Sequence, residues 1–71
     1  MKNALRYDFN TSELLERLKS KESTIYRNVG MALKDVHDAL CKAIKEKRYE
    51  EAARFREQEV NYANRVIRML E

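Results

Sequence analysis

The chain has 71 residues, of which 38% are charged and 44% hydrophobic, with one glycine and no proline. A chain of this length forms one small domain (residues 1–71), and the scarcity of turn residues argues against sheets and favours an all-α protein. The formal net charge is only +3, and acidic and basic residues alternate along the chain. The charge balance therefore gives no argument for a nucleic-acid partner.

The cysteine content and hydropathy pattern exclude two further classes of protein. Cys41 is the only cysteine, so no disulfide can form within the chain. A single thiol without a signal-like apolar run fits a reducing cytoplasm. No apolar stretch approaches the roughly 18 residues that a membrane-spanning helix needs. We therefore expect a cytoplasmic protein that does not contact a membrane.

Residues 1–10 show no periodicity and are predicted to form a tail. Tyr7 and Phe9 are the apolar anchors that would pin this segment onto the helices. A docking peptide that binds a partner through the same two aromatic residues is the alternative interpretation.

A short helix is predicted over residues 12–20. Asn10 followed by Glu13 has the pattern of a capping box, although Thr11 or Ser12 could also cap the helix. Residues 20–23 contain no apolar residue and offer two serines as caps, which predicts a break. One uninterrupted helix from about residue 12 is the alternative, since neither proline nor glycine forbids it.

Two long helices are predicted over residues 24–46 and 50–70, because apolar residues recur in steps of three and four. The first apolar stripe comprises Ile25, Val29, Ala32, Val36, Ala39 and Ala43, with Leu33, Leu40 and Ile44 at its edge. The second comprises Ala52, Ala53, Val60, Ala63, Ile67 and Leu70, with Phe55, Tyr62, Val66 and Met69 at its edges. Gly30 lies beside the first stripe, where it could permit close approach of another backbone but is more simply interpreted as a neutral occupant.

Equal lengths and a short polar link predict that these helices form an antiparallel, coiled-coil-like hairpin. The apolar residues at the edges of the stripes exceed what two helices bury against each other. The short helix, a second copy or another protein must cover them. We expect a homodimer that forms a helical bundle, or a tight contact with a different protein, since so short a chain has little stability in reserve.

The link and the start of the second helix, residues 45–59, read KEKRYEEAARFREQE. Lysines end one helix and acids begin the next, as the helix dipoles favour. Tyr49 is expected to fold back on Ala53 in a staple-like contact, with Ala52 and Ala53 both facing inward.

The stretch from Leu40 to Glu57 resembles the UVR motif, a helical hairpin found in UvrB, UvrC, the middle domain of the ATPase ClpC and the regulator McsA. Leu40, Ala43 and Ile44 stand at the buried positions of the motif's first helix. Tyr49 stands for its phenylalanine, Glu50 for its glutamate, Ala52-Ala53 for its alanine pair, Phe55 for its leucine and Arg56-Glu57 for Arg-Asp. Two positions depart from the pattern: Arg48 replaces an acid, and Glu59 replaces an apolar residue whose burial Val60 could take over.

The resemblance implies a non-enzymatic protein–protein interaction module, an adaptor-like regulator that binds a Clp-type ATPase or another UVR-like hairpin. The predicted partner-binding residues are Arg48, Tyr49, Glu50, Phe55, Arg56 and Glu57, with the aromatic residues as buried anchors and Glu50, Arg56 and Glu57 providing specificity. The alternatives are a repair-associated binder of the UvrB–UvrC type and a basic helical dimer that binds DNA through the lysines and arginines around the link.

No catalytic, metal or cofactor site is predicted. His37 is the only histidine and is interpreted as an ordinary surface or boundary residue, because one histidine cannot supply a dyad or a His-rich metal site. Cys41 is interpreted as a buried or half-buried inert thiol without an accompanying base. One glycine cannot form a phosphate-binding loop.

Overall fold

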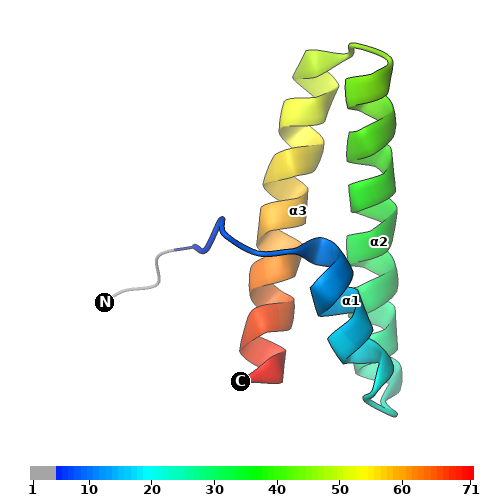
Figure 1. The fold of residues 1–71 in the computed structure, drawn as a ribbon, viewed down its shortest axis with the longest axis vertical. Coiled ribbons are helices and arrows are strands. Elements are labelled where there is room, and N and C mark those ends of the chain that lie inside the picture. Colours follow the sequence, from blue (N-terminus) through cyan, green and yellow to red (C-terminus); the bar gives the residue numbers. More distant parts are fainter. Residues whose placement is uncertain (1–4) are drawn as a thin grey trace.

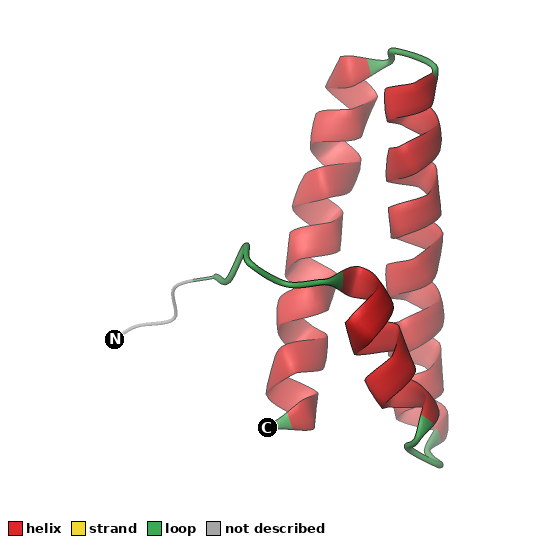
Figure 2. Ribbon diagram, in the orientation of Figure 1, coloured by secondary structure: helices red, strands yellow, loops and turns green. Residues whose placement is uncertain are grey.

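The computed structural model describes residues 5–71 and consists of three helices, α1 (Thr11–Lys19), α2 (Thr24–Lys45) and α3 (Tyr49–Leu70) (Figure 1). No strand occurs in this range (Figure 2), which confirms the prediction of an all-α fold. The long helices α2 and α3 lie side by side and run in opposite directions, and α1 packs across both near the C-terminal end of α3. None of these helices is long and apolar enough to cross a membrane.

The first helix begins at the predicted cap and ends at the predicted break. The Asn10 side chain accepts a hydrogen bond from the backbone N–H of Glu13 at 3.0 Å, so Asn10 is the N-cap rather than Thr11 or Ser12. The chain leaves helical geometry over residues 20–23, which makes the alternative of one uninterrupted helix wrong. The residues of this loop are all polar, so a helix here would have no apolar face to bury.

The turn between α2 and α3 depends on one residue with a positive φ. Lys47 has φ 62°, in the left-handed region. Its N–H donates to the carbonyl of Ile44 at 3.0 Å, and the Arg48 N–H donates to the carbonyl of Ala43 at 2.8 Å. This pair of bonds is the Schellman motif that closes a helix C-terminus, with lysine at the position usually held by glycine. The motif redirects the chain within a few residues so that α3 can return along α2.

The core has two parts because α1 covers only one end of the α2–α3 pair. Leu14, Leu18, Leu33, Ala63 and Val66 form a buried cluster to which all three helices contribute. Burying a leucine of this kind stabilises the fold by about 1.5–3 kcal/mol. A smaller cluster nearer the turn contains only α2 and α3 residues.

The buried stripes are rotated from the predicted ones. Leu33, Leu40 and Val66 were expected at the edges and lie in the core, whereas Ile25 and Ala53 were expected inside and are exposed. The reason is that α2 contacts α1 as well as α3, which draws its buried face toward Gly30 and Leu33. An apolar stripe predicted for a helix that packs against one other helix does not include this rotation.

Gly30 is not a neutral occupant but allows α1 to pack closely. A Cβ atom at this position would lie 3.1 Å from Cδ1 of Leu18, tighter than ordinary van der Waals contact. The glycine is buried, and its missing side chain is what lets Leu18 reach the surface of α2. Relative to alanine, the glycine costs about 1 kcal/mol in helix propensity.

The segment before α1 is held mainly through its backbone. The Asn64 side chain accepts from the Arg6 N–H at 2.7 Å and donates to the Arg6 carbonyl at 2.9 Å. Phe9 is half-buried against the core, as expected, but the Tyr7 side chain is exposed, so its predicted anchoring role is wrong. Residues 1–4 of the predicted tail lie outside the described range.

Candidate interaction site at the α2–α3 turn

The turn end of the α2–α3 pair carries a groove with exposed apolar side chains. The groove has a volume of about 670 Å³ and lies between α2, α3 and the segment that leads into α1. Ile44 and Tyr49 line it and remain 52% and 65% exposed. Leu40 and Ala52, which are buried, also contribute to its wall. Two large exposed hydrophobic side chains thus line one groove.

Two local expectations about this end of the molecule are wrong. Tyr49 is the first residue of α3 and not the residue before it, and its ring is largely exposed. Only one of the two neighbouring alanines faces inward: Ala52 is buried, whereas Ala53 is exposed and lines the groove. The exposed ring and the exposed alanine together extend the apolar surface of the groove.

The six predicted partner-binding residues divide among four locations. Tyr49 and Arg56 line the groove; Phe55 packs on the smaller core cluster; Arg48 lies in the turn; Glu50 and Glu57 are exposed on α3. The Arg48 guanidinium pairs with Glu46 at 2.9 Å and with Glu51 at 3.0 Å, across the turn. The structure thus brings Tyr49 and Arg56 to one groove and leaves the other four outside its lining.

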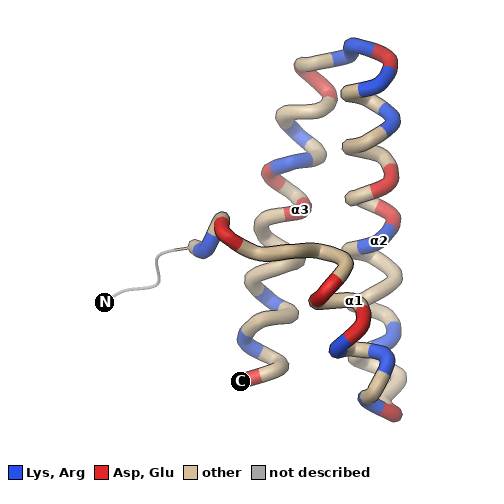
Figure 3. The backbone as a smooth tube through the Cα atoms, in the orientation of Figure 1, with Lys and Arg blue, Asp and Glu red and all other residues tan. Residues whose placement is uncertain are grey.

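Charges of both signs surround the turn. Figure 3 shows lysine or arginine alternating with aspartate or glutamate along both long helices at this end. Such mixed surfaces do not form the continuous basic track that nucleic acid requires. The groove's own rim carries one exposed cation, Arg56, whose guanidinium is already engaged.

Glu59 also lines this groove, and its role was not predicted from the sequence. Its side chain is only 3% exposed, and its carboxylate accepts three hydrogen bonds: from the Thr11 hydroxyl at 2.8 Å, from Nδ1 of His37 at 2.6 Å and from Nη1 of Arg56 at 2.7 Å. One carboxylate therefore joins α1, α2 and α3 at the groove wall. Val60 was expected to take over the burial of this position. It is buried, but Glu59 is buried as well, so Val60 does not replace it in the core.

The three hydrogen bonds set the ionisation of Glu59. Burial by itself raises the pKa of the carboxyl group, but the hydrogen bonds from His37, Thr11 and Arg56 and the positive charge of His37 outweigh it and hold the pKa below its ordinary value. The carboxylate is consequently ionised at neutral pH and acts as a fixed acceptor.

Arg56 is positioned by this network rather than left unengaged for a partner. Besides its bond to Glu59, its guanidinium donates to the Tyr7 carbonyl at 3.5 Å and lies 5.1 Å from the centre of the Phe9 ring. A cation over an aromatic face is stabilised by about 0.5–1 kcal/mol at an exposed site. The arginine is thus held at the rim of the groove with part of its guanidinium still accessible.

Cys41 and His37 lie in the same groove, and the surroundings of Cys41 differ from those expected. Cys41 is exposed, not buried, and its Sγ atom is 3.7 Å from Nε2 of His37, so a base does accompany it. His37 is half-buried, at the boundary as one of the two expected alternatives, and its Nδ1 atom lies 2.6 Å from a carboxylate oxygen of Glu59. Within the described range, no group of three histidine, cysteine or acidic side chains is arranged to hold a metal ion.

The signals that could have revealed this site differ in strength. Glu59 follows Ala52 by seven residues and precedes Ala63 by four, so helical spacing places it in the apolar stripe, where a carboxylate needs partners. Nothing in the sequence identified those partners, because Thr11 and His37 come from other helices.

Comparisons of the chain with protein families, with curated proteins and with solved structures found no match.

Proposed function

We propose that this protein is a non-enzymatic protein–protein interaction module whose α2–α3 pair acts as a UVR-like helical hairpin. The observation that carries the proposal is the groove at the turn, where Ile44 and Tyr49 remain largely exposed beside a fixed arginine. Ile44 and Tyr49 are already partly buried, so covering the 52% and 65% of them that remain exposed stabilises a complex by about 2–3 kcal/mol before the costs of association. That gain is large enough to make them the central contacts of an interface.

The proposed partner presents a helix to this groove. The groove runs beside two antiparallel helices, so a ridge of side chains from a third helix can lie in it, in the helix-in-groove mode. The resemblance of residues 40–57 to the UVR motif supports a helical hairpin as that partner, either the middle domain of a Clp-type ATPase or a second copy of this chain. An adaptor-like regulator of such an ATPase is the function we favour.

The predicted contact residues take different roles in this proposal. Tyr49 is the apolar anchor, and Arg56, held in place by Glu59, is the charged group at the rim. Arg48, Glu50 and Glu57 surround the groove and act on specificity, since exposed charges influence association rates and partner choice more than affinity. Phe55 supports the helix start from the core side.

Binding to a purified ClpC-type middle domain, measured by isothermal titration calorimetry, tests the proposal. Tyr49→Ala is expected to weaken binding at least ten-fold, which corresponds to about 1.4 kcal/mol. Ile25→Ala is a matched control, because Ile25 is 67% exposed on α2 at the end far from the turn. If the unmutated protein does not bind, the ATPase is rejected as the partner. If the two substitutions have equal effects, the groove is rejected as the binding site.

Sedimentation velocity tests the second copy as the partner. If the groove forms a homodimer interface, Ile44→Glu is expected to convert the dimer into monomer, whereas Ile25→Glu leaves the dimer intact. A monomer for the unmutated protein at every accessible concentration contradicts the homodimer and leaves the heteromeric contact to be tested separately.

A salt titration of DNA binding separates the proposal from a DNA-binding dimer. We expect weak binding without a steep salt dependence, because Glu46, Glu50 and Glu51 lie among the basic residues of the turn. Tight binding that falls steeply with salt would favour the DNA-binding alternative.

A further inference from the structure

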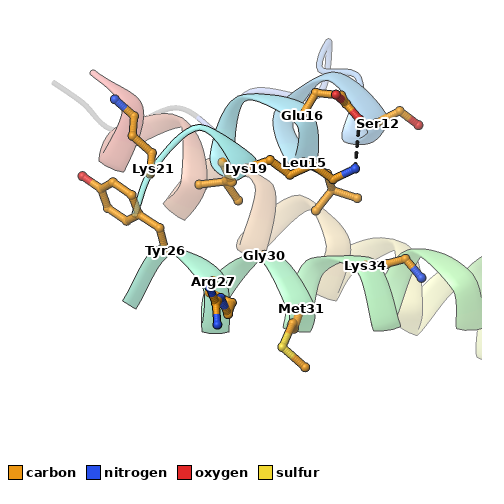
Figure 4. Close-up of a pocket in the computed structure, with 11 residues that line it drawn as sticks. Ser12, Leu15, Glu16, Lys19, Lys21, Tyr26, Arg27, Gly30, Met31 and Lys34 are labelled. Atoms are coloured by element: carbon orange, nitrogen blue, oxygen red, sulfur yellow. Dashed lines mark hydrogen bonds and ion pairs between the residues drawn. The ribbon is translucent and has the colours of Figure 1, made fainter. Parts of the chain in front are cut away.

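A second groove lies between α1 and the N-terminal half of α2, away from the turn. Its volume is about 440 Å³. Leu15 and Leu18 from α1 and Tyr26 and Gly30 from α2 supply its apolar surface, with Met31 exposed at its edge. Figure 4 shows Leu15 entering this space from α1 and Tyr26 bordering it from the α2 side.

The groove exists because of how Gly30 and Leu18 fit together. Leu18 packs directly over the glycine, which draws the C-terminal part of α1 down onto α2. Leu15, one turn earlier on α1, lies beside this contact and is only half-buried. The nine residues of α1 span about 13 Å. A helix of two to three turns can therefore contact the whole length of the groove.

The rim of the groove is basic on both walls. Lys19 on α1, Lys21 in the following loop and Arg27 and Lys34 on α2 line the groove, and Glu16 is the one acid among the lining residues (Figure 4). Lys19 pairs with Glu16 at 3.2 Å and Lys34 with Asp38 at 3.4 Å, but these side chains are 61–75% exposed.

These cations can be redirected to a ligand at little cost. Exposed ion pairs of this kind contribute about 0–1 kcal/mol. Within residues 5–71, Lys21 and Arg27 take part in no ion pair. The residues that line the groove therefore carry a formal charge of +3. This equals the formal net charge of the entire chain.

We infer that the groove between α1 and α2 binds an acidic amphipathic helical segment of a partner protein. The apolar side chains of that segment contact Leu15 and Tyr26, and its carboxylates pair with Lys21 and Arg27 on opposite walls. The complementarity of an apolar floor and a basic rim carries the proposal. It is separate from the proposal for the groove at the turn, because different α2 residues line the two grooves, within 26–34 here and within 37–44 there.

A protein segment fits this surface better than a membrane does. A helix that binds lipid presents its cations along one convex face that lies flat on the headgroups. Here the cations stand on two walls with a concave apolar floor between them, which encloses a narrow rod-like ligand.

Two synthetic peptides of roughly 15 residues, long enough for four helical turns, test the proposal. Both carry leucine at helical i, i+3, i+4 and i+7 spacing; one has glutamate at the remaining surface positions and the other has lysine. Fluorescence anisotropy with the full-length protein should show saturable binding of the acidic peptide and at least ten-fold weaker binding of the basic one.

The single glycine provides a direct readout of where the peptide binds. Gly30 lines the groove and is the only glycine in the chain, so its amide signal is readily recognised in a ¹H–¹⁵N correlation spectrum. The acidic peptide is expected to shift this signal, and saturation of the shift should follow the anisotropy curve. Binding that leaves the Gly30 signal in place and shifts that of Tyr49 instead would overturn the assignment of the site.

Matched charge reversals give the control. Lys21→Glu with Arg27→Glu should raise the dissociation constant at least ten-fold, and Lys21→Gln with Arg27→Gln should raise it less. Arg65→Glu with Arg68→Glu changes the net charge equally on the exposed side of α3 and should leave binding unchanged.

Three outcomes would each overturn the proposal. The first is no binding of the acidic peptide; the second is equal weakening by both pairs of charge reversals, which indicates attraction to net charge alone. The third combines two results: the acidic peptide does not bind, and the protein co-sediments with phosphatidylserine vesicles in a way that depends on Lys21 and Arg27. This combination would assign the groove to a membrane surface.

Discussion

Replacement of Glu59 by alanine is predicted to cost this small protein a large part of its stability. The substitution removes an acceptor that holds Thr11, His37 and Arg56 at 2.6–2.8 Å. Hydrogen bonds to a charged group contribute about 1.5–3 kcal/mol each. The side chains of His37 and Arg56 are 37% and 45% exposed and can regain water, so only the bond from the buried Thr11 is lost in full.

These considerations give an expected loss of about 3 kcal/mol, composed of the Thr11 bond, part of the other two bonds and the lost packing. A chain of 71 residues has a free energy of unfolding of roughly 4–10 kcal/mol. The midpoint of urea unfolding, followed by far-UV circular dichroism, should therefore fall by about 3 M, since the slope for so small a protein is roughly 1 kcal/mol/M.

Glu57→Ala is the matched control, because Glu57 is exposed on the same helix. It should change the free energy of unfolding by less than about 0.5 kcal/mol. Glu59→Leu combined with Thr11→Val should recover much of the lost stability, since the buried hydroxyl is then removed together with its acceptor. Similar losses for Glu57→Ala and Glu59→Ala would refute the conclusion that the Glu59 network holds the three helices together.

The same network predicts a specific pH dependence. The folded-state pKa of Glu59 lies below the unfolded value, so its contribution is complete above the unfolded pKa and is lost as pH falls through the folded pKa. The difference in free energy of unfolding between the unmutated protein and Glu59→Gln should be largest at neutral pH and shrink in this acidic range. A difference that stays constant down to strongly acidic pH contradicts the assigned ionisation.

Three further predictions concern other parts of the fold. Lys47→Gly should stabilise the protein by about 0.5–1 kcal/mol, because glycine adopts φ 62° without strain; a lower urea midpoint contradicts this. Leu33→Ala should destabilise the protein by about 2–5 kcal/mol in thermal unfolding, whereas the exposed Met31→Ala should have little effect; equal shifts refute the assignment of the core. Cys41 should react with Ellman's reagent in the folded protein at a rate that does not increase with urea below the unfolding transition, and a urea-dependent rate would place the thiol inside.

The sequence was sufficient for the fold class and for the local helix signals. The Asn10 cap could be predicted because it depends on residues within one turn. The exact buried faces could not, because they depend on the position of α1: Leu33 is central only where α1 covers the adjacent side of α2. Periodicity gives the width of an apolar face, but the contacts of a third helix decide its centre.

The candidate site was predictable to a smaller extent. The exposed charges of residues 45–59 drew attention to the turn, and Tyr49 lies in its groove as part of the surface we propose for binding. Glu59 was recognised only as a departure from the UVR pattern. Its role depends on Thr11, 48 residues away, and on His37, 22 residues away, and no local pattern reports such separations.

The two hydrogen bonds between the Asn64 side chain and the Arg6 backbone also bear on the order in which the structure forms. They close a separation of 58 residues, whereas α2 and α3 meet through a short turn. Each doubling of a loop adds about 0.6 kcal/mol of closure cost, so docking of the N-terminal segment is at least 2 kcal/mol more costly in chain entropy than pairing of the long helices. We expect α2 and α3 to pair first during folding, with the segment before α1 docking last. In the native protein the same segment should be the first to detach. It would then unfold and refold locally as one cooperative unit while α2 and α3 stay paired.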